Sequence, residues 1–194
     1  ELPDPIPGFM QLVHYLGGFE AALENSSTVG PEVRRWVPFI LARRGLAEMF
    51  RDRDRVVHAD CKVNNLLFHI GFDSVASVLD LDTVMLGHWA WDFGDLARSA
   101  AADASGFSAD RFLALAEAFV PAAGIEPDRD ALLMAPRYVA LMLGVRFLTD
   151  HLRGDLYFKV AAPGDNLNRA ISQFTLLRAM EQQEAALRAR LKRI

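Results

Sequence analysis

One segment of this chain is apolar on every side of a helix, and the rest of the fold has to cover it. The segment is residues 129–152, where the hydrophobic side chains surrounding the axis are Leu132, Leu133, Val139, Leu141, Met142, Leu143, Val145, Phe147 and Leu148. A helix without a polar face is stable in water only when other elements pack around it. We therefore expect a buried central helix over 129–152 in a mainly helical domain.

The flanking segments predict further helices around this centre. Three of them are expected over residues 31–51, 89–102 and 165–190. Pro31 suits the first position of the first of these helices, because its missing N–H is not needed there. Residues 9–25 are expected to form two short helices, since two consecutive glycines, Gly17 and Gly18, interrupt the pattern.

A fourth flanking helix is indicated by its end signals alone. Ser108 is a good N-cap, and Phe107 and Phe112 are spaced as a hydrophobic staple across it. Gly124 fits the position just beyond the last helical residue. With 52% apolar residues among 194, the chain is long enough for one sizeable core, and we expect a single domain.

Composition excludes several classes of partner. The formal charge of −4 leaves no basic face for nucleic acid. No apolar run reaches the roughly 18 residues that a membrane helix needs, so no membrane partner is expected. The single cysteine, Cys61, permits no internal disulfide and fits a reducing compartment, and we expect a cytoplasmic protein.

Residues 56–82 interrupt the helical pattern with a small β-unit. Val56 and Val57 lead into a polar loop, and residues 66–68 and 75–81 form two short apolar runs with a turn between them. These features predict strand, loop, strand, turn and strand. The fold class expected is thus α+β and mainly α, with helices around a β-hairpin unit that carries a polar loop.

The polar loop has the spacing His58-x-Asp60-x-Lys62-x-x-Asn65, and Asp80 follows fifteen residues beyond Asn65. This pattern resembles the catalytic loop and metal-binding strand of the protein-kinase-like superfamily. The resemblance implies that Asp60 accepts or orients the proton of a substrate hydroxyl and that Lys62 offsets charge on the transferred phosphate.

The same resemblance implies a Mg²⁺ site formed by Asn65 and Asp80, because Mg²⁺ prefers oxygen ligands. Asp82 falls on the same face as Asp80 if both lie in a strand, so it is a third expected ligand. The sequence Asp92-Phe93-Gly94 spells the metal motif of protein kinases, but it lies twenty-seven residues beyond Asn65. We expect Asp92 to cap or anchor the following helix instead.

The resemblance can be narrowed by longer runs: residues 58–68, 79–87 and 91–98, and the Arg-Phe-Leu-Thr-Asp and Tyr-Phe-Lys runs that begin at Arg146 and Tyr157. They are similar to the aminoglycoside phosphotransferase family, and within it to the N-acetylhexosamine 1-kinase branch. The similarity extends from about Pro5 to Met180. It implies ATP-dependent phosphorylation of a sugar at its anomeric hydroxyl, with Arg146 and Tyr157 lining the sugar pocket.

Three departures from the family pattern, Ala59, Cys61 and Leu86, leave the choice of substrate open. Another small alcohol, such as an aminoglycoside or a choline-like amino alcohol, is one alternative, and a non-catalytic binding domain with a kinase fold is another. Arg146 stands four residues before Asp150, so an alternative is that the two residues form an intrahelical ion pair and have no further role. Tyr157 could be a packing aromatic with its hydroxyl at the surface.

A kinase-like enzyme also needs a nucleotide lobe, with a glycine-rich loop and a strand lysine for the phosphates of ATP. Neither is visible ahead of His58, where a proline-rich segment and helices stand. We therefore expect residues 1–194 to be the C-terminal lobe of such an enzyme, without the N-terminal lobe of the same polypeptide. This lobe alone is expected to bind ATP poorly.

Overall fold

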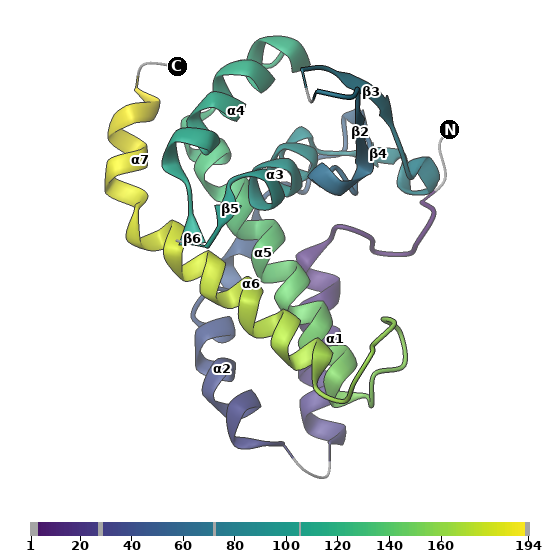
Figure 1. Cartoon of the computed structure of the whole chain (residues 1–194). Helices are drawn as coiled ribbons and strands as arrows, with labels where there is room; N and C mark the ends of the chain where they lie inside the picture. Colours follow the sequence, from purple (N-terminus) through teal and green to yellow (C-terminus); the bar gives the residue numbers. More distant parts are fainter. Residues whose placement is uncertain (1–3, 27–28, 72, 105, 193–194) are drawn as a thin grey trace.

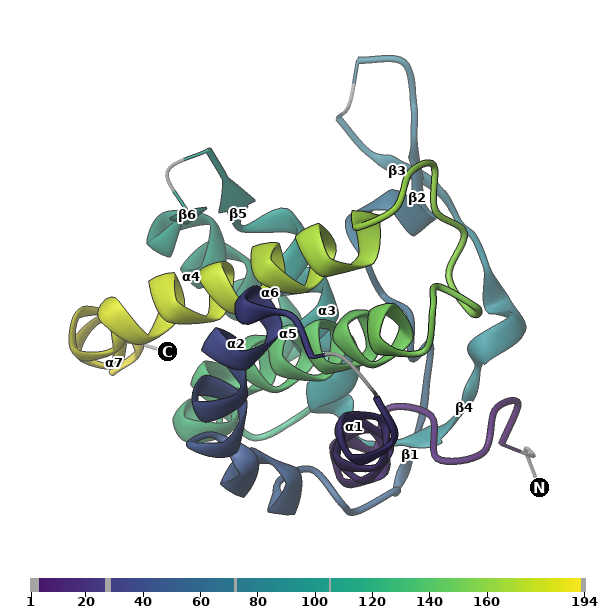
Figure 2. The same ribbon diagram turned by 90° about the horizontal axis from the view of Figure 1, so that it is seen from below.

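The computed structural model describes residues 4–26, 29–71, 73–104 and 106–192. It is mostly helical with small sheets, and its centre is α5 (Arg129–Leu152), the helix that the apolar pattern predicts. Figure 2 shows α6 (Asp165–Gln182) and α1 (Leu12–Asn25) on opposite sides of α5. The α3 helix (Trp89–Ala100) also packs on α5, so the expected covering of the central helix is confirmed.

The remaining helices complete the outer layer of the domain (Figure 1). They are α2 (Pro31–Leu41), α4 (Ala109–Ala123) and α7 (Glu184–Leu191). Three short 3₁₀ helices accompany them: η1 (Arg44–Glu48), η2 (Val63–Asn65) and η3 (Leu81–Thr83). The last two lie in the polar β-unit and contain candidate site residues.

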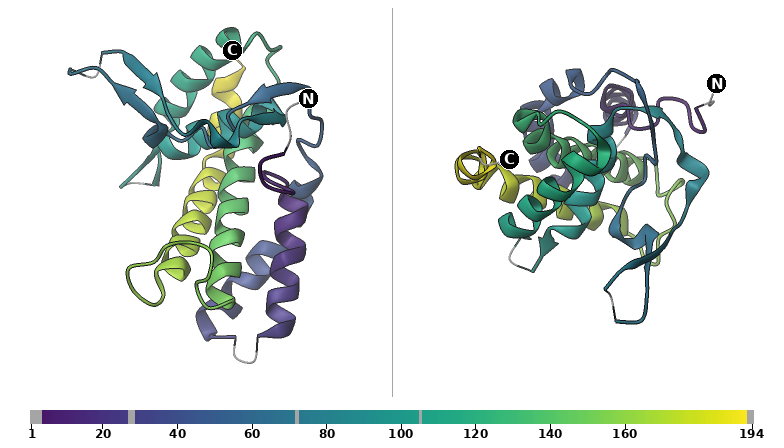
Figure 3. Two further views of the ribbon diagram at one scale, coloured as in Figure 1. Left: turned by 90° about the vertical axis from the view of Figure 1, so that its right-hand side faces the viewer. Right: turned by 90° about the horizontal axis from the view of Figure 1, so that it is seen from above.

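The β-structure within the described ranges consists of three separate antiparallel pairs. They are β1 (Arg55–Val57) with β4 (Met85–Gly87), β2 (Leu66–Phe68) with β3 (Val75–Val78), and β5 (Ala102–Asp103) with β6 (Gly106–Phe107). The β2–β3 hairpin projects away from the helices (Figure 3). The expected class, helices around a small hairpin unit, is therefore confirmed.

Three helix boundaries differ from expectation. Residues 12–25 form one continuous helix despite Gly17 and Gly18, because Leu12, Leu16 and Phe19 bury one side of it. The helix that begins at Pro31 ends at Leu41 rather than near residue 51. The helix expected over 165–190 is divided at Gln183 into α6 and α7.

The end signals of α4 are confirmed. The Ser108 side chain accepts a hydrogen bond from the Arg111 N–H, and Gly124 adopts the left-handed conformation with φ 58°. The rings of Phe107 and Phe112 lie with their centroids 5.6 Å apart. These signals are local, which is why the sequence alone predicts them.

Two glycines allow the close packing on α5. A Cβ added to Gly94 of α3 would lie 2.5 Å from the Ala135 carbonyl oxygen, and one added to Gly144 would lie 2.3 Å from the Phe174 ring. Both distances are shorter than side-chain contacts permit, so the two interfaces depend on glycine.

One helix is long and apolar enough to be compared with a membrane-spanning helix. By length and composition α5 could cross a membrane, although 78% of its most apolar window is buried within the described structure. The helix is nevertheless not one uninterrupted apolar run, because Arg137 and Arg146 lie within it, so the expectation stated for such runs is not contradicted. Burial of this kind is what a central core helix shows.

Candidate active site

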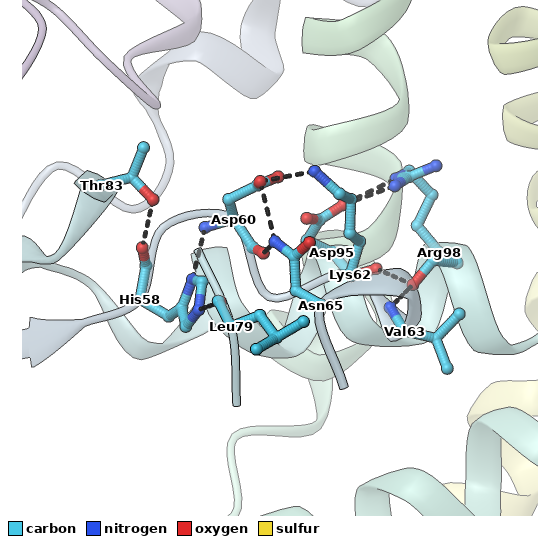
Figure 4. Close-up of polar contacts among 10 residues, drawn as sticks. His58, Asp60, Lys62, Val63, Asn65, Leu79, Thr83, Asp95 and Arg98 are labelled. Atoms are coloured by element: carbon cyan, nitrogen blue, oxygen red, sulfur yellow. Dashed lines mark hydrogen bonds and ion pairs between the residues drawn. The ribbon is translucent and has the colours of Figure 1, made fainter. Parts of the chain in front are cut away.

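Residues 58–65 form a loop between β1 and β2, and three predicted site residues converge in it (Figure 4). The Asp60 carboxylate oxygen Oδ2 accepts hydrogen bonds from Lys62 Nζ at 2.6 Å and from Asn65 Nδ2 at 2.9 Å. The same Asn65 Nδ2 also donates to the Asp60 carbonyl oxygen at 2.8 Å. The spacing in the sequence thus corresponds to a compact cluster of acid, cation and amide.

The segment that precedes Asp80 is fastened to this cluster. The Leu79 N–H donates to the Asn65 carbonyl oxygen at 2.8 Å, and the Leu79 carbonyl oxygen lies 2.8 Å from His58 Nε2. His58 therefore has a structural role, because it links the loop that follows β1 to the segment that follows β3. Leu79 is thus hydrogen-bonded at both its N–H and its carbonyl oxygen. Asp80 comes directly after this residue, whose backbone is bonded to Asn65.

The reason given for Asp82 as a metal ligand is wrong, because Asp80 and Asp82 do not lie in a strand. The β3 strand ends at Val78. Asp80 is left-handed, with φ 63°, and caps η3, which contains Asp82. The two carboxylates are thus placed by a tight turn, which Thr83 fixes by donating its hydroxyl to the His58 carbonyl oxygen at 2.8 Å.

The residue types expected at the cation site, one amide oxygen and two carboxylates, suit a hard cation. Since Nδ2 of Asn65 makes both bonds to Asp60, its Oδ1 remains for another partner. Within the described ranges, no three His, Cys, Asp or Glu side chains gather into a group that could hold a metal ion. A site with Asn65, Asp80 and Asp82 has two carboxylates, so phosphate oxygens and water would complete it, as is usual for Mg²⁺.

Asp92 anchors the loop rather than capping a helix. Its two carboxylate oxygens accept hydrogen bonds from the His58 N–H at 2.9 Å and the Ala59 N–H at 2.8 Å. The cap of α3 is His88, whose Nδ1 accepts from the Ala90 N–H. Burial raises the pKa of Asp92, and the two backbone hydrogen bonds oppose this shift. The Asp-Phe-Gly sequence is therefore a support of the loop.

Sequence reasoning missed one further support that α3 supplies to the loop, Ser99, and a buried ion pair within the same helix. Ser99 Oγ accepts a hydrogen bond from the Val63 N–H at 2.9 Å. Asp95 is buried and pairs with Arg98 at 2.6 Å; burial raises its pKa, and the Arg98 charge opposes the shift. Both residues belong to or directly follow the Trp-Asp-Phe-Gly-Asp-Leu-Ala-Arg run, so their proximity to the motif was the available signal.

The two departures inside the loop have visible structural consequences. Ala59 is buried and left-handed, with φ 62°, a conformation that Asn adopts more readily than Ala. Cys61 is half-buried beside three carboxylates, and burial, followed by the charges of Asp92, Asp95 and Asp60, raises the pKa of its thiol to about 12. The thiol is consequently protonated at neutral pH.

Arg146 and Tyr157 come together in a pocket of about 500 Å³. Segments distant in the sequence line it: the stretch before α1, α1 itself, α5, and the 153–164 loop that joins α5 to α6. The Arg146 guanidinium carbon lies between 5.0 and 5.9 Å from the centroids of four rings, those of Phe9, Tyr15, Tyr157 and Phe158. The structure thus places two predicted substrate residues in one cavity.

The alternative of an Arg146–Asp150 ion pair is not what the structure contains. Both carboxylate oxygens of Asp150 accept hydrogen bonds from the 153–164 loop and from Asn166. The Tyr157 ring is 65% exposed, so it is not a core aromatic. No residue of the 58–65 loop lines this pocket among the described residues, and the two clusters remain separate features.

The proline-rich stretch contacts both the β-unit and the helical body, and its Ile6 and Pro7 line the pocket. At one end, Arg53 forms an ion pair with Asp4 and donates to the Leu86 carbonyl oxygen of β4 at 2.8 Å. At the other end, the buried Tyr138 hydroxyl donates to the Met10 carbonyl oxygen at 2.7 Å and accepts from the Leu12 N–H. The stretch is therefore fixed on both the β-unit and the helical body.

Comparison with known families gives the site its chemical context. Residues 22–133 match the family model described as APH, the phosphotransferase enzyme family. The match covers more than half of the chain and includes the whole 56–82 unit and Asp92, whereas Arg146 and Tyr157 lie beyond it. The convergence of Asp60, Lys62 and Asn65 agrees with a family of kinase-like phosphotransferases that act on small substrates. The chain therefore belongs to the aminoglycoside phosphotransferase (APH) family of phosphotransferase enzymes.

Proposed function

We propose that the protein is the catalytic lobe of an ATP- and Mg²⁺-dependent sugar kinase, with the anomeric hydroxyl of an N-acetylhexosamine as acceptor. The observation that carries the proposal is the Asp60–Lys62–Asn65 cluster, in a loop that Asp92 holds by accepting a hydrogen bond from the Ala59 N–H. A non-catalytic scaffold would not need a lysine ammonium group and an asparagine amide hydrogen-bonded to the same carboxylate oxygen.

Asp60 is the group that orients the acceptor hydroxyl and receives its proton. Its Oδ2 is occupied by Lys62 and Asn65, whereas its Oδ1 makes no hydrogen bond within the described part of the chain. Oδ1 is therefore the atom that faces the substrate hydroxyl, and a general base needs this direct contact.

Lys62 is close enough to exchange partners during the reaction. Its Nζ lies 2.6 Å from Asp60, and a phosphate arriving at the loop offers it a second anionic partner. Asn65, Asp80 and Asp82 would hold Mg²⁺, which when bound neutralises charge on the phosphates of ATP. The loop thus separates proton acceptance by Asp60 from charge compensation by its neighbours.

The Arg146 pocket supports a neutral, polar acceptor. Arg146 offers hydrogen-bond donors, and the surrounding rings offer flat apolar surfaces of the kind that pack against a sugar. Asp150 lines the pocket, but both of its oxygens are already hydrogen-bonded. In this pocket a polycationic aminoglycoside would lie beside the positive charge of Arg146 and would find no unpaired carboxylate. This disfavours the aminoglycoside alternative.

The proposal includes a nucleotide lobe of the same polypeptide above the β2–β3 hairpin. Leu67, Phe68, Val75 and Val78 of this hairpin are between 38% and 49% exposed. Exposed apolar side chains, present here on both faces of the hairpin, are typical of an interaction surface. A cytoplasmic location is part of the proposal, and the single, protonated Cys61 is compatible with it.

The test is ATP consumption by the protein with its nucleotide lobe against N-acetylhexosamines, aminoglycosides and choline. We expect turnover with a hexosamine and a loss of at least 10²-fold in the Asp60→Asn variant, the usual scale for a general base. Asp73→Asn, an equivalent change in the exposed turn beyond β2, serves as the matched control. No sugar-dependent turnover, or full activity of Asp60→Asn, would overturn the proposal.

The competing hypothesis, a non-catalytic binding domain, gives a different result in the same experiment. It predicts that the wild-type protein binds a small alcohol in calorimetry but consumes no ATP with any acceptor. Turnover with choline or an aminoglycoside alone would retain the kinase assignment and replace the sugar.

A further inference from the structure

A buried carboxylate organises the exposed loop that carries Tyr157. Asp150, near the end of α5, is 5% exposed. Its Oδ1 accepts hydrogen bonds from the backbone N–H groups of Leu156 at 3.0 Å and Tyr157 at 2.8 Å. Its Oδ2 accepts from the Phe158 N–H at 2.9 Å. Three consecutive amides of the 153–164 loop are thus fixed by one side chain.

Asn166, at the start of α6, closes the network from the other side. It is fully buried, and its Nδ2 donates to Asp150 at 2.9 Å and to Asp155 at 2.8 Å. Arg169 donates to the Asn166 side-chain oxygen and to the Lys159 carbonyl oxygen. The loop between α5 and α6 is therefore held by both helices that it connects.

The loop itself contributes little to the core, so core stability is not a sufficient reason for this network. Leu156 and Tyr157 are 81% and 65% exposed. Burying a carboxylate is unfavourable unless hydrogen bonds compensate for the lost water. Four such bonds compensate here, and the result is a fixed backbone at the residue whose ring faces Arg146.

The ring of Tyr157 is fixed through its neighbour. Phe158 packs on Phe147 of α5 with centroids 4.6 Å apart, and Tyr157 stands edge-on to Phe158 at 4.8 Å. The Tyr157 centroid lies 5.9 Å from the Arg146 guanidinium carbon. Backbone and ring are thus both held at the rim of the pocket.

We propose that Asp150 is a positioning residue of the acceptor site, which acts by holding Tyr157 against Arg146. The inference rests on the proposed function, because it takes the Arg146 pocket as the place where the acceptor is bound. Preorganised binding groups depend on such supporting hydrogen bonds. Asp150 therefore raises acceptor affinity through Tyr157, without contact with the phosphates.

The first test is a double-mutant cycle between Asp150 and Tyr157 in the protein with its nucleotide lobe. We expect Asp150→Asn to raise the KM for the acceptor about tenfold, a common effect of removing a supporting hydrogen bond, with KM for ATP unchanged. Tyr157→Ala should have a similar effect, and the double variant should be no worse than Tyr157→Ala. Additive effects, or an equal change in KM for ATP, would overturn the inference.

The control is Asp165→Asn, which changes a carboxylate at the first residue of α6 that holds the same loop at Ala161 and Ala162 rather than at Tyr157. Asp165 accepts hydrogen bonds from the N–H groups of Ala161 and Ala162. We expect its substitution to leave the KM for the acceptor within twofold of wild type. An effect as large as that of Asp150→Asn would contradict the specific role of Asp150.

The second test does not require activity, and so separates this inference from the proposed function. Trypsin can cut the loop after Arg153 and Lys159, and cleavage reports local opening. We expect faster cleavage at these positions in Asp150→Asn, with near-ultraviolet circular dichroism unchanged. Equal cleavage rates would overturn the inference even if the wild-type protein is an active sugar kinase.

Faster loop cleavage in a protein that phosphorylates no sugar would retain the anchor and refute the acceptor pocket. Should Asp150→Asn not fold, Asn166→Ala carries the same comparisons, because it removes one of the four hydrogen bonds to Asp150 and leaves three.

Discussion

At the scale of single residues, the 58–65 loop combines the proposed site residues with a thiol that is kept unreactive. Cys61 stands between Asp60 and Lys62 in the sequence, yet the pKa of its thiol is raised to about 12 by burial and by the surrounding carboxylates. A thiol reacts as its thiolate. The only cysteine of the chain is therefore expected to be inert in the folded protein.

This inertness can be measured directly. At pH 8 we expect a thiol reagent such as iodoacetamide to label the folded chain at least tenfold more slowly than the chain unfolded in urea, whose thiol has a pKa of about 8.5. Because there is one cysteine, the label needs no mapping. Equal rates in the two states would show that the thiol is exposed and ionised in the fold.

The same shift predicts how stability depends on pH. Between pH 8.5 and 12 the unfolded thiol loses its proton and the folded one keeps it, so raising the pH favours unfolding. From pH 7.5 to 9.5 we expect the free energy of unfolding to fall by about 1 kcal/mol through this group. Urea denaturation of wild type and Cys61→Ala at both pH values isolates it, and an identical fall in both would contradict the assignment.

Individual residues were predicted well where the chemistry is a matter of spacing. Asp60, Lys62 and Asn65 lie within five residues of each other, so a loop of this kind brings them together. The left-handed conformations of Ala59 and Asp80 could not be predicted, because tertiary hydrogen bonds impose them. Ala59 is held by Asp92, thirty-three residues away, and Asp80 follows a residue held by Asn65 and His58.

At the scale of secondary-structure elements, α3 is the support of the 58–65 loop. Asp92 and Ser99 of this one helix fix the backbone of residues 58, 59 and 63. The helix is in turn seated on α5 through Gly94. The position of the Asp60 carboxylate therefore depends on a chain of contacts that begins in the buried core.

This support predicts the effect of Asp92→Asn. The amide can accept one of the two backbone hydrogen bonds, but its NH₂ group then faces the other N–H, which costs about 1–3 kcal/mol of stability. We expect a fall in kcat that exceeds the change in KM for the acceptor, because the loop that carries Asp60 is loosened. Steady-state kinetics and urea denaturation measure the two effects.

Ser99→Ala is the matched control for this prediction. It also removes a hydrogen bond from α3 to the loop, but at Val63, beyond Asp60 and Lys62. A smaller loss of kcat is expected. If Asp92→Asn lowered stability but left kcat at the wild-type value, α3 would be a structural partner of the loop only.

Helices were predictable where local signals mark their ends. The caps of α4 and the bounds of α5 agree with the sequence, since each signal acts within a few residues. The division between α6 and α7 at Gln183, and the continuity of α1 through Gly17 and Gly18, follow from packing. In α1 the buried Leu12, Leu16 and Phe19 outweigh the roughly 1 kcal/mol that each glycine costs.

At the scale of the whole molecule, the pocket could not have been derived from sequence pattern alone. It unites residues from the stretch before α1, from α1, from α5 and from the 153–164 loop. Only the resemblance of the runs at Arg146 and Tyr157 to a known family indicated two of its residues. The sequence predicted for Asp150, the carboxylate that supports this pocket, at most an ion pair with Arg146. No local sequence signal indicates its hydrogen bonds to backbone amides six to eight residues further along the chain.

An exposed apolar surface on the β2–β3 hairpin is the last feature at this scale. Both strands of the β2–β3 hairpin present apolar side chains to solvent, and Ile70 at its turn is fully exposed. The hairpin projects from the helical body (Figure 3), and these side chains are exposed within the described part of the chain. Such a surface favours association with another surface of similar character.

The double substitution Leu67→Lys and Val78→Lys tests what this surface is for. Because Leu67 pairs with Ser77 and Val78 with Leu66, the two charges stand on opposite faces of the hairpin. In the 194-residue chain both face solvent, so we expect less self-association in light scattering and a melting temperature within a few degrees of wild type. In the protein with its nucleotide lobe, one of the two charges would lie against an apolar partner surface, whichever face of the hairpin the lobe covers. There we expect weaker ATP binding, because the lobe that holds the nucleotide is no longer seated on the hairpin. Val13→Lys, at a similarly exposed position of α1, should change neither property; an unchanged ATP affinity in the double variant would show that the lobe does not use the hairpin.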